Sequence, residues 1–169
     1  MKRNKQYGFL CFLLSAFFST APFALESDAD QPIVIDSNTA TYDDKAEVSI
    51  YTGDVLSVQG SIRVKSDKLT VHFVNGEAEQ LIFTGNPAKF RQTPKEGKED
   101  ITGEALIGEY YPKKNLLILK NNATVWQGNG TYSSDFIEYD IKTSLVKAGE
   151  KSSDAKRVHV IIKPKSKQQ

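Results

Sequence analysis

Catalysis and metal binding need particular side chains at particular spacings, and this sequence offers few of them. Each of the two histidines, His72 and His159, sits at a polar position of an alternating segment, with no partner at metal-ligand spacing. The only cysteine is Cys11, so the chain after it has no thiol for a disulfide, a nucleophile or a thiolate metal site. The HExxH, G-x-S-x-G, Walker and G-x-G-x-x-G motifs are absent.

Carboxylates are the remaining candidates for chemistry, since residues 25–150 hold 20 Asp and Glu. A pair of them could hydrolyse a glycosidic bond. No pair stands out in the sequence, and acids scattered in this way normally keep a β-rich surface soluble. We predict that the protein is not an enzyme and uses no cofactor or metal, with a carbohydrate-active enzyme as the alternative.

The N-terminus reads as a targeting segment. Lys2, Arg3 and Lys5 precede an apolar run over residues 7–18, and a small residue, Ala24, follows. This order is typical of a secretory signal peptide, and the run is shorter than the roughly 20 residues that a membrane span needs. We predict a cleaved signal over residues 1–24 and export to the periplasm; a retained anchor is the alternative.

The exported chain is slightly acidic, with 19 basic and 21 acidic residues once the signal is removed. Nucleic acid is therefore an unsuitable partner, because phosphate binding requires a concentrated basic face. Residues 151–169 differ, with six Lys and Arg against only Asp154. We interpret them as a C-terminal edge strand and a solvated basic tail beyond the main domain of residues 25–150; docking to an acidic partner is the alternative.

Apolar residues in this domain recur with period two. Ile62 and Val64, then Leu69, Val71 and Phe73, alternate with polar residues. Such alternation gives each strand one apolar and one wet face, which favours an antiparallel sheet. The sequence thus predicts an all-β fold.

Turn signals separate the strands. Asn75-Gly76 predicts a type I′ hairpin; further breaks are expected at residues 43–45, 112–115 and 142–144, and a loop at residues 93–100. Polar-acid pairs at 36–37, 66–67, 103–104 and 134–135 are interpreted as strand starts. Two of the units that follow reach a Thr-Gly-acid or Thr-Gly-amide element, at 52–54 and 84–86, and the third has Lys-Asn-Asn at the same place, 120–122. Their spacing near 30 residues favours stacked strand–turn–strand units over a closed barrel.

The apolar faces of the strands must be covered. They can pack on a second sheet, as in an ordinary core, or on a ligand. The terminal strands, with residues 32–36 and 157–163, are predicted sheet edges, and unpaired edges invite another chain. Edges at both ends favour head-to-tail contact; a tail that covers its own edge is the alternative.

The sequence resembles the LptA/OstA family of lipopolysaccharide transport in the order and spacing of several stretches. They are QPIVIDSNTATYDD (31–44), YTGDVLSVQGSIRVKSDKLTV (51–71), TGNPAKFRQ (84–92), ITGEALIGEYYPKKNLLILKNNATVWQ (101–127) and FIEYDI (136–141). The resemblance implies a twisted, open β-jelly-roll whose apolar groove shields lipid acyl chains between the inner and outer membranes. The Lys120-Asn121-Asn122 element and the last strands depart from the family pattern.

By this resemblance, together with the alternating faces, the expected lipid-binding residues are Ile33, Ile35, Ile62, Val64, Leu69, Val71, Phe90, Tyr110, Leu117 and Leu119. The expected partner interfaces are Ile33, Val34 and Ile35 at one end and Val158, Val160 and Ile162 at the other. The implied partners are lipopolysaccharide, further copies of the chain, an LptC-like inner-membrane protein at the N-terminal edge and an LptD-like outer-membrane protein at the C-terminal edge. A β adaptor that binds no lipid is the alternative function.

Overall fold

The computed structural model describes residues 28–94, 98–150 and 156–164. The predicted signal peptide, Cys11 and the last residues of the basic tail lie outside this range. The described chain contains the 3-10 helices η1 (Asp28–Asp30) and η2 (Pro112–Lys114) and the strands β1 (Ile33–Asp36), β2 (Thr39–Asp43), β3 (Val48–Gln59), β4 (Ile62–Val74), β5 (Glu77–Gln92), β6 (Ile101–Tyr111), β7 (Leu116–Gln127), β8 (Gly130–Asp140), β9 (Leu145–Ala148) and β10 (His159–Ile162). None of its helices is long and apolar enough to cross a membrane.

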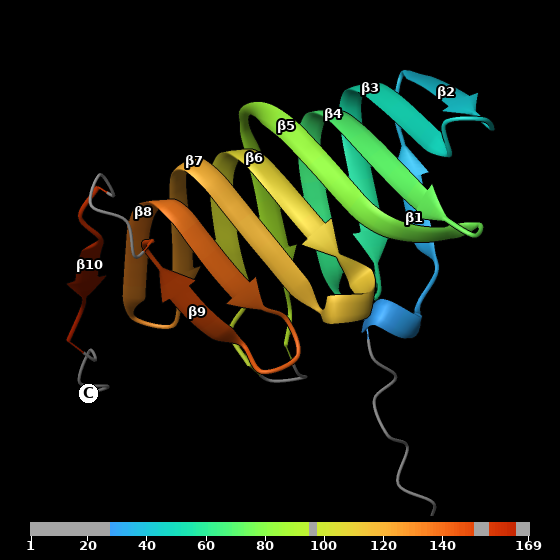
Figure 1. Cartoon of the computed structure of the whole chain (residues 1–169). Coiled ribbons are helices and arrows are strands. Elements are labelled where there is room, and N and C mark those ends of the chain that lie inside the picture. The colour runs from blue at the N-terminus through green and yellow to red at the C-terminus, as the bar shows by residue number, and fades with distance from the viewer. Residues whose placement is uncertain (1–27, 95–97, 151–155, 165–169) are drawn as a thin grey trace, which may run out of the picture.

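All described strands belong to one antiparallel sheet. Its order is β1-β3-β4-β5-β6-β7-β8-β10, with β2 beside β3 and β9 beside β8. Figure 1 shows the strands following one another along a long axis, with β1 and β2 at one end and β9 and β10 at the other. Because the first and last strands do not pair, the sheet is open, which confirms the predicted open, stacked β architecture.

Each long strand bends near its middle, where the pairing register shifts. The shifts lie between Thr52 and Val55 in β3, and at the corresponding places in the strands that follow up to β7–β8. Gly53 and Asp54 have φ of 85° and 44° at this bend, and Asn121 and Asn122 have φ of 64° and 55°. Glycine and asparagine tolerate this left-handed region better than other residues, so the sequence can bend here without ending the strand.

Several sequence predictions are wrong at these bends. Residues 66–67, 103–104 and 134–135, expected to start strands, lie inside β4, β6 and β8. The recurring elements at 52–54, 84–86 and 120–122 lie inside β3, β5 and β7, at the bends. A bulged bend and a strand start use the same small or polar residue types, which tolerate a left-handed backbone. The local sequence therefore does not distinguish the two.

The hairpin turns fall where the sequence places them. Asn75 and Gly76 both have positive φ, 53° and 79°, as a type I′ turn requires. Turns at residues 44–47 and 141–144, and η2 followed by left-handed Asn115, confirm the other expected breaks. The loop expected at residues 93–100 joins β5 to β6, with residues 95–97 outside the described range.

The bends divide the sheet into two layers, here called half-sheets. Half-sheet 1 contains β1, β10 and residues 55–59, 62–65, 88–92, 101–105, 123–127 and 130–134 of the long strands. Half-sheet 2 contains β2, β9 and residues 48–52, 68–74, 77–84, 107–111, 116–120 and 136–140. Alternate residues of both layers are buried, so the two inner faces pack on each other.

Candidate functional site

The inner faces carry apolar residues in rows that run across the strands along the long axis. In half-sheet 2, cross-strand pairing aligns one row in the order Tyr51, Leu69, Phe83, Gly108, Leu119, Ile137 and Ala148. In half-sheet 1, the facing row is Ile35, Ser57, Val64, Phe90, Gly103, Val125, Tyr132 and Val160. Both rows extend from one end of the sheet to the other.

The predicted lipid-binding residues are brought together by the fold. Ile62, Val64, Leu69, Val71, Phe90, Tyr110, Leu117 and Leu119 all belong to one buried cluster between the half-sheets, and Ile33 and Ile35 of β1 pack against it. Sequence reasoning omitted Phe83, Val125, Ile137 and Tyr139, which are equally buried. Period two in LIF (81–83) and FIEY (136–139) was a signal that could have included Phe83, Ile137 and Tyr139.

The interior is filled rather than hollow. The space bordered by Val64, Phe83, Phe90 and Leu119 amounts to about 10 Å³. Pockets that hold drug-sized ligands are typically about 300–1,000 Å³. The rings of Phe90 and Tyr139, from opposite half-sheets, contact each other with centroids 5.4 Å apart. The half-sheets must therefore move apart before this interior can hold an acyl chain.

Side-chain size increases from the bent side of the molecule toward the other side. The inner residues beside the bends, here called the apex row, are Val55, Ser66, Ala88, Ala105, Ala123 and Ser134. Larger residues such as Leu69 and Phe83 follow, and tyrosines and glutamines lie at the far side. Small residues allow the two layers to approach where the backbone joins them, so the interior has the shape of a wedge.

Opposite the apex, hydrogen bonds donated by side chains close the long side of the wedge, here called the seam. Tyr110 of half-sheet 2 donates to Gln59 Oε1 of half-sheet 1 over 2.8 Å. Tyr139 of half-sheet 2 donates to Gln92 Oε1 over 2.6 Å. Gln127 Nε2 donates to the Ser144 carbonyl over 2.9 Å. We call these three contacts crossbridges.

The three crossbridge glutamines occupy equivalent places, as the last residues of β3, β5 and β7. Gln59 and Gln92 are both at least 95% buried, with 5% and 3% exposure. Sequence reasoning missed them because a single glutamine at a strand end is unremarkable in composition. Their recurrence at spacings of 33 and 35 residues was a signal that could have found them.

Burial keeps the crossbridge tyrosines protonated and able to donate. Loss of solvation raises the pKa of Tyr139 from 10 to about 12. Burial, aided by the negative charge of Asp28, raises the pKa of Tyr110 further. Both hydroxyls therefore remain neutral donors over the physiological pH range.

Polar contacts at η1 reinforce the N-terminal part of the seam. Asp28 accepts hydrogen bonds from the Ser61 backbone N–H at 2.6 Å and from Gln92 Nε2 at 3.0 Å. Gln59 Nε2 donates to the carbonyls of Ala29 and Gln31. These bonds tie the segment before β1 to the glutamines of half-sheet 1.

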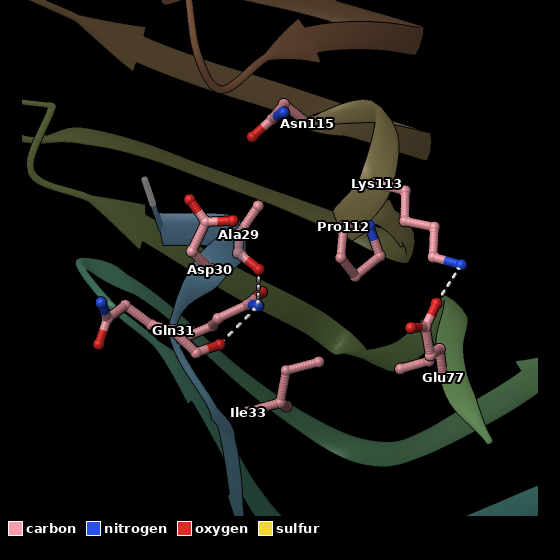
Figure 2. Close-up of a pocket in the computed structure, with 10 residues that line it drawn as sticks. Ala29, Asp30, Gln31, Ile33, Glu77, Pro112, Lys113 and Asn115 are labelled. Carbon is pink, nitrogen blue, oxygen red and sulfur yellow. Dashed lines mark hydrogen bonds and ion pairs between the residues drawn. The ribbon is translucent and has the colours of Figure 1, made fainter. Parts of the chain in front are cut away.

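A hollow of about 580 Å³ opens beside these contacts. Figure 2 shows it between residues 29–33 on one side and Pro112, Lys113 and Glu77 on the other, with Lys113 paired to Glu77 at 2.6 Å. A second hollow of about 530 Å³ lies between residues 98–101 and residues 141–144, near the Gln127 crossbridge. The seam is thus flanked by two open recesses, whereas the interior between the half-sheets is filled by side chains.

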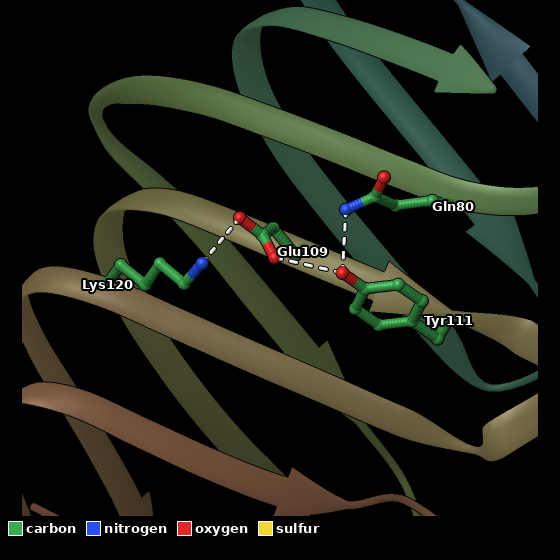
Figure 3. A network of polar contacts seen from close by, with 4 residues as sticks. All are labelled: Gln80, Glu109, Tyr111 and Lys120. Atoms are coloured by element: carbon green, nitrogen blue, oxygen red, sulfur yellow. Dashed lines mark hydrogen bonds and ion pairs between the residues drawn. The ribbon is translucent and has the colours of Figure 1, made fainter. Parts of the chain in front are cut away.

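The outer face carries polar networks of a different kind. Figure 3 shows Gln80, Glu109, Tyr111 and Lys120, which lie on adjacent strands β5, β6 and β7. Tyr111 accepts a hydrogen bond from Gln80 at 2.7 Å, and Lys120 pairs with Glu109 at 2.7 Å. All of these contacts lie within half-sheet 2, so they do not join the two layers.

The predicted interface residues lie at the ends of the sheet. Val34 of β1 is 53% exposed, and Ile162 of β10 is 71% exposed. Val160 is also exposed, and Val158 precedes β10 in an extended segment. Ile33 and Ile35 differ because their side chains turn toward the interior and pack on the core. No described residue pairs with the outer edge of β1 or β10.

The site offers binding surface rather than reactive groups. Within residues 28–94, 98–150 and 156–164, no cluster of three His, Cys, Asp or Glu is placed to hold a metal ion. Two seam glutamines bond to tyrosines and the third to a loop carbonyl, and the interior is largely apolar. Such an arrangement can shield hydrocarbon and can hydrogen-bond the polar groups attached to it.

Proteins with similar sequences and a similar fold are named as components of lipopolysaccharide export. Residues 34–145 match the model of a family described as LptA/(LptD N-terminal domain) LPS transport protein. The lipopolysaccharide export protein LptH of Pseudomonas aeruginosa is 32% identical over 163 residues, covering 93% of each chain. LptA of Escherichia coli K12 is 32% identical, covering 96% of this chain and 88% of its own.

The fold matches as well as the sequence. The crystal structure of P. aeruginosa LptH, described as the LptA-homologous periplasmic component of the lipopolysaccharide transport device, superimposes with a TM-score of 0.76. That comparison covers 82% of this chain and 100% of the LptH chain, at 30% identity.

Proposed function

This chain belongs to the LptA/LptD N-terminal-domain family of lipopolysaccharide transport proteins, and we propose that it carries lipopolysaccharide across the periplasm with the acyl chains between its half-sheets. The family transports lipid and is not a family of enzymes. The sequence prediction of a non-enzymatic lipopolysaccharide carrier is confirmed at this level. The ten predicted lining residues and the partners remain part of the proposal.

The observation that supports this proposal most directly is the pair of inner rows that run the whole length of the sheet. Each buried methylene contributes about 0.8 kcal/mol, so exposing an acyl chain of about 14 carbons costs on the order of 10 kcal/mol. A row of similar apolar side chains offers similar contacts at each step along the axis. Lipid can then advance without leaving an apolar environment.

Photocrosslinking from adjacent residues tests lipid binding. A photoreactive amino acid at Tyr110 or Ile35, which face inward, is expected to crosslink to lipopolysaccharide. The same probe at Tyr111 or Val34, their outward-facing neighbours, is the matched control. Equal labelling at inner and outer positions, or no labelling at any of them, would contradict lipid binding in the interior and favour the β adaptor.

The geometry of the ends supports head-to-tail assembly. Neighbouring strands alternate in direction from β1 to β10, so β1 of a second copy can continue the sheet as an antiparallel neighbour of β10. Ile162 and Val160 of one copy then fall in line with Ile33 and Ile35 of the next, because these residues already occupy the same inner rows. The apolar rows thereby pass from one protomer to another.

The same edges provide sites for the membrane partners. An LptC-like inner-membrane protein adds its strand at β1, and the N-terminal domain of an LptD-like outer-membrane protein adds its strand at β10. Both contacts are strand additions to an unpaired edge. Because the two edges differ, each partner binds one particular end, and this sets the orientation of the carrier between the two membranes.

Assembly can be tested at β10 without disturbing the core. The double substitution Val160→Lys/Ile162→Lys places charge on the proposed contact and is expected to shift concentration-dependent oligomers to monomers. Deletion of residues 157–169 should do the same. Lys163→Gln, which leaves the apolar residues in place, is the control. Light scattering that shows unchanged oligomers in both altered proteins would rule out this edge as the contact.

Export to the periplasm is the remaining part of the proposal. It rests on the predicted signal over residues 1–24 and on the similarity to P. aeruginosa LptH, whose structure is described as a periplasmic component. Mass spectrometry of the protein from a periplasmic extract is expected to show a mature chain that begins at Leu25. A full-length chain in the membrane fraction would instead indicate a retained anchor.

A further inference from the structure

The seam is closed by glutamine and tyrosine side chains, with loop carbonyls as further acceptors, and its crossbridges follow one another along the long axis. Gln59, Gln92 and Gln127 end strands that are each separated by one intervening strand. With neighbouring strands about 4.8 Å apart, successive crossbridges are about 10 Å apart. A molecule that advances along the interior and projects through the seam therefore meets them in order.

An amphiphile cannot avoid this side of the protein. Its chains belong in the apolar interior, whereas its charged head must stay in water. At the apex the backbone of β3 to β8 runs continuously from one half-sheet to the other, which leaves no passage for a head group. At the seam, the hydrogen bonds that join the half-sheets among the described residues run between side chains, or from a glutamine side chain to the loop carbonyls of Ile141 and Ser144.

We propose that the Tyr110–Gln59, Tyr139–Gln92 and Gln127–Ser144 crossbridges are successive gates, which the polar neck of the lipid opens and occupies as its chains move through the interior. This inference rests on the proposed function. To that function it adds a route for the head group, and it assigns a role to polar side-chain groups at the seam, among them the hydroxyl of the predicted lining residue Tyr110.

The chemistry of the gates suits the neck of such a lipid. A buried amide or hydroxyl that loses its partner is strongly penalised, so an opened gate needs a replacement partner. The amide, ester and hydroxyl groups that join acyl chains to a sugar head supply both donors and acceptors. Gln59 and Gln92 can donate and accept, and the neutral tyrosine hydroxyls can do both as well.

The first test removes two gates while keeping their rings. The double substitution Tyr110→Phe/Tyr139→Phe is compared with Tyr111→Phe, which removes the neighbouring hydroxyl that bonds to Gln80 on the outer face. Stopped-flow mixing with fluorescently labelled lipopolysaccharide is expected to show association and dissociation at least several-fold faster in the double variant. The control should match the wild-type protein.

The second test holds a gate shut. Cysteines at Gln59 and Tyr110, joined by a short cleavable bismaleimide, tie the half-sheets together, while cysteines at Gln80 and Tyr111 provide a matched pair within one half-sheet. Cys11, the only native cysteine, lies in the segment predicted to be removed on export. Crosslinking across the seam should slow lipid loading at least tenfold, and cleavage of the linker should restore it.

The outcomes separate this inference from the function on which it rests. Unchanged rates in Tyr110→Phe/Tyr139→Phe, or full-speed loading of the protein locked across the seam, would overturn the gates while leaving lipid binding in place. If the wild-type protein binds no labelled lipopolysaccharide, the proposed function fails as well. Circular dichroism of each variant confirms that the sheet has folded, so that a lost signal is assigned correctly.

Discussion

The two long sides of the molecule close the same interior by different means. At the apex, the backbone of β3 to β8 joins the half-sheets, and small residues such as Ala105 and Ala123 allow close packing. At the seam, the larger side chains of Tyr110 and Gln59 meet through a hydrogen bond. The apex is therefore a permanent joint, whereas the seam can open and close without breaking the sheet.

This difference gives the apolar interior a way to admit cargo. A β-sandwich closed on both sides by backbone would protect its core but admit no lipid. A sheet open on one side would expose its apolar rows to water. Closure of one side by a few exchangeable hydrogen bonds avoids both outcomes, because each bond contributes only about 0.5–1.5 kcal/mol net.

The largest effect is expected when the apex is overpacked. Ala105 is 1% exposed beside the bend of β6, so Ala105→Leu forces the half-sheets apart where the backbone holds them. We expect a loss of about 1–3 kcal/mol in the free energy of unfolding, toward the upper end. Urea denaturation measures it, with Ala40→Leu on the exposed strand β2 as the control. Equal, small losses would mean that the apex is not tightly packed.

The second prediction compares glutamines on the two faces. Gln92→Leu leaves the buried Tyr139 hydroxyl without its acceptor and removes the bond to Asp28. It is expected to cost about 1–3 kcal/mol of unfolding free energy. Gln80→Leu, also the partner of a tyrosine, is expected to change stability by no more than about 0.5 kcal/mol, because Tyr111 keeps Glu109 and remains near solvent. Comparable losses in the two variants would argue that glutamines at the seam and on the outer face contribute equally to stability.

The third prediction concerns alkaline pH. The folded protein raises the pKa of Tyr139 to about 12, against 10 for the free side chain, so its neutral form contributes stability that is fully present below pH 10. That contribution falls as the pH rises through 12, by on the order of 2 kcal/mol. Denaturant unfolding at pH 9 to 12 should therefore show a steeper loss in the wild-type protein than in Tyr110→Phe/Tyr139→Phe. Parallel curves for the two proteins would contradict this account of the seam.

The smallest effect is expected at Ser66 in the apex row. Its hydroxyl is buried and has no hydrogen-bond partner among the described residues. Ser66→Ala removes an unpaired polar atom while nearly keeping its volume, so stability should rise, by about 1 kcal/mol at most. Thermal melting measures the gain. A clear loss would show that the apex, like the seam, depends on polar contacts.

Much of the interior could be predicted from residue order. Period two assigned Ile62, Val64, Leu69 and Val71 to one face, and the structure buries all four. The hairpin turn at Asn75-Gly76 was also predicted correctly, because a type I′ turn requires positive φ at both residues and both adopt it. Family resemblance added Phe90 and Tyr110 as lining residues; the structure buries both, and their lipid contact stays a prediction.

The bends and the seam could not be predicted in this way. Thr52-Gly53-Asp54 has the composition of a turn, yet β3 continues through it because β4 pairs with both of its halves. Gln59 and Tyr110 are 51 residues apart and meet only when the half-sheets close. Nothing near either residue in the chain indicates the other.

The sequence by itself determined which side chains point inward, because alternation is a local property of an extended backbone. Only the tertiary structure decided that the strands bend instead of ending, that the inner faces fill the space between them, and that glutamines meet tyrosines along one side. Those outcomes depend on register between distant strands. Register is a property of the whole sheet, since it is set by the packing of both layers together.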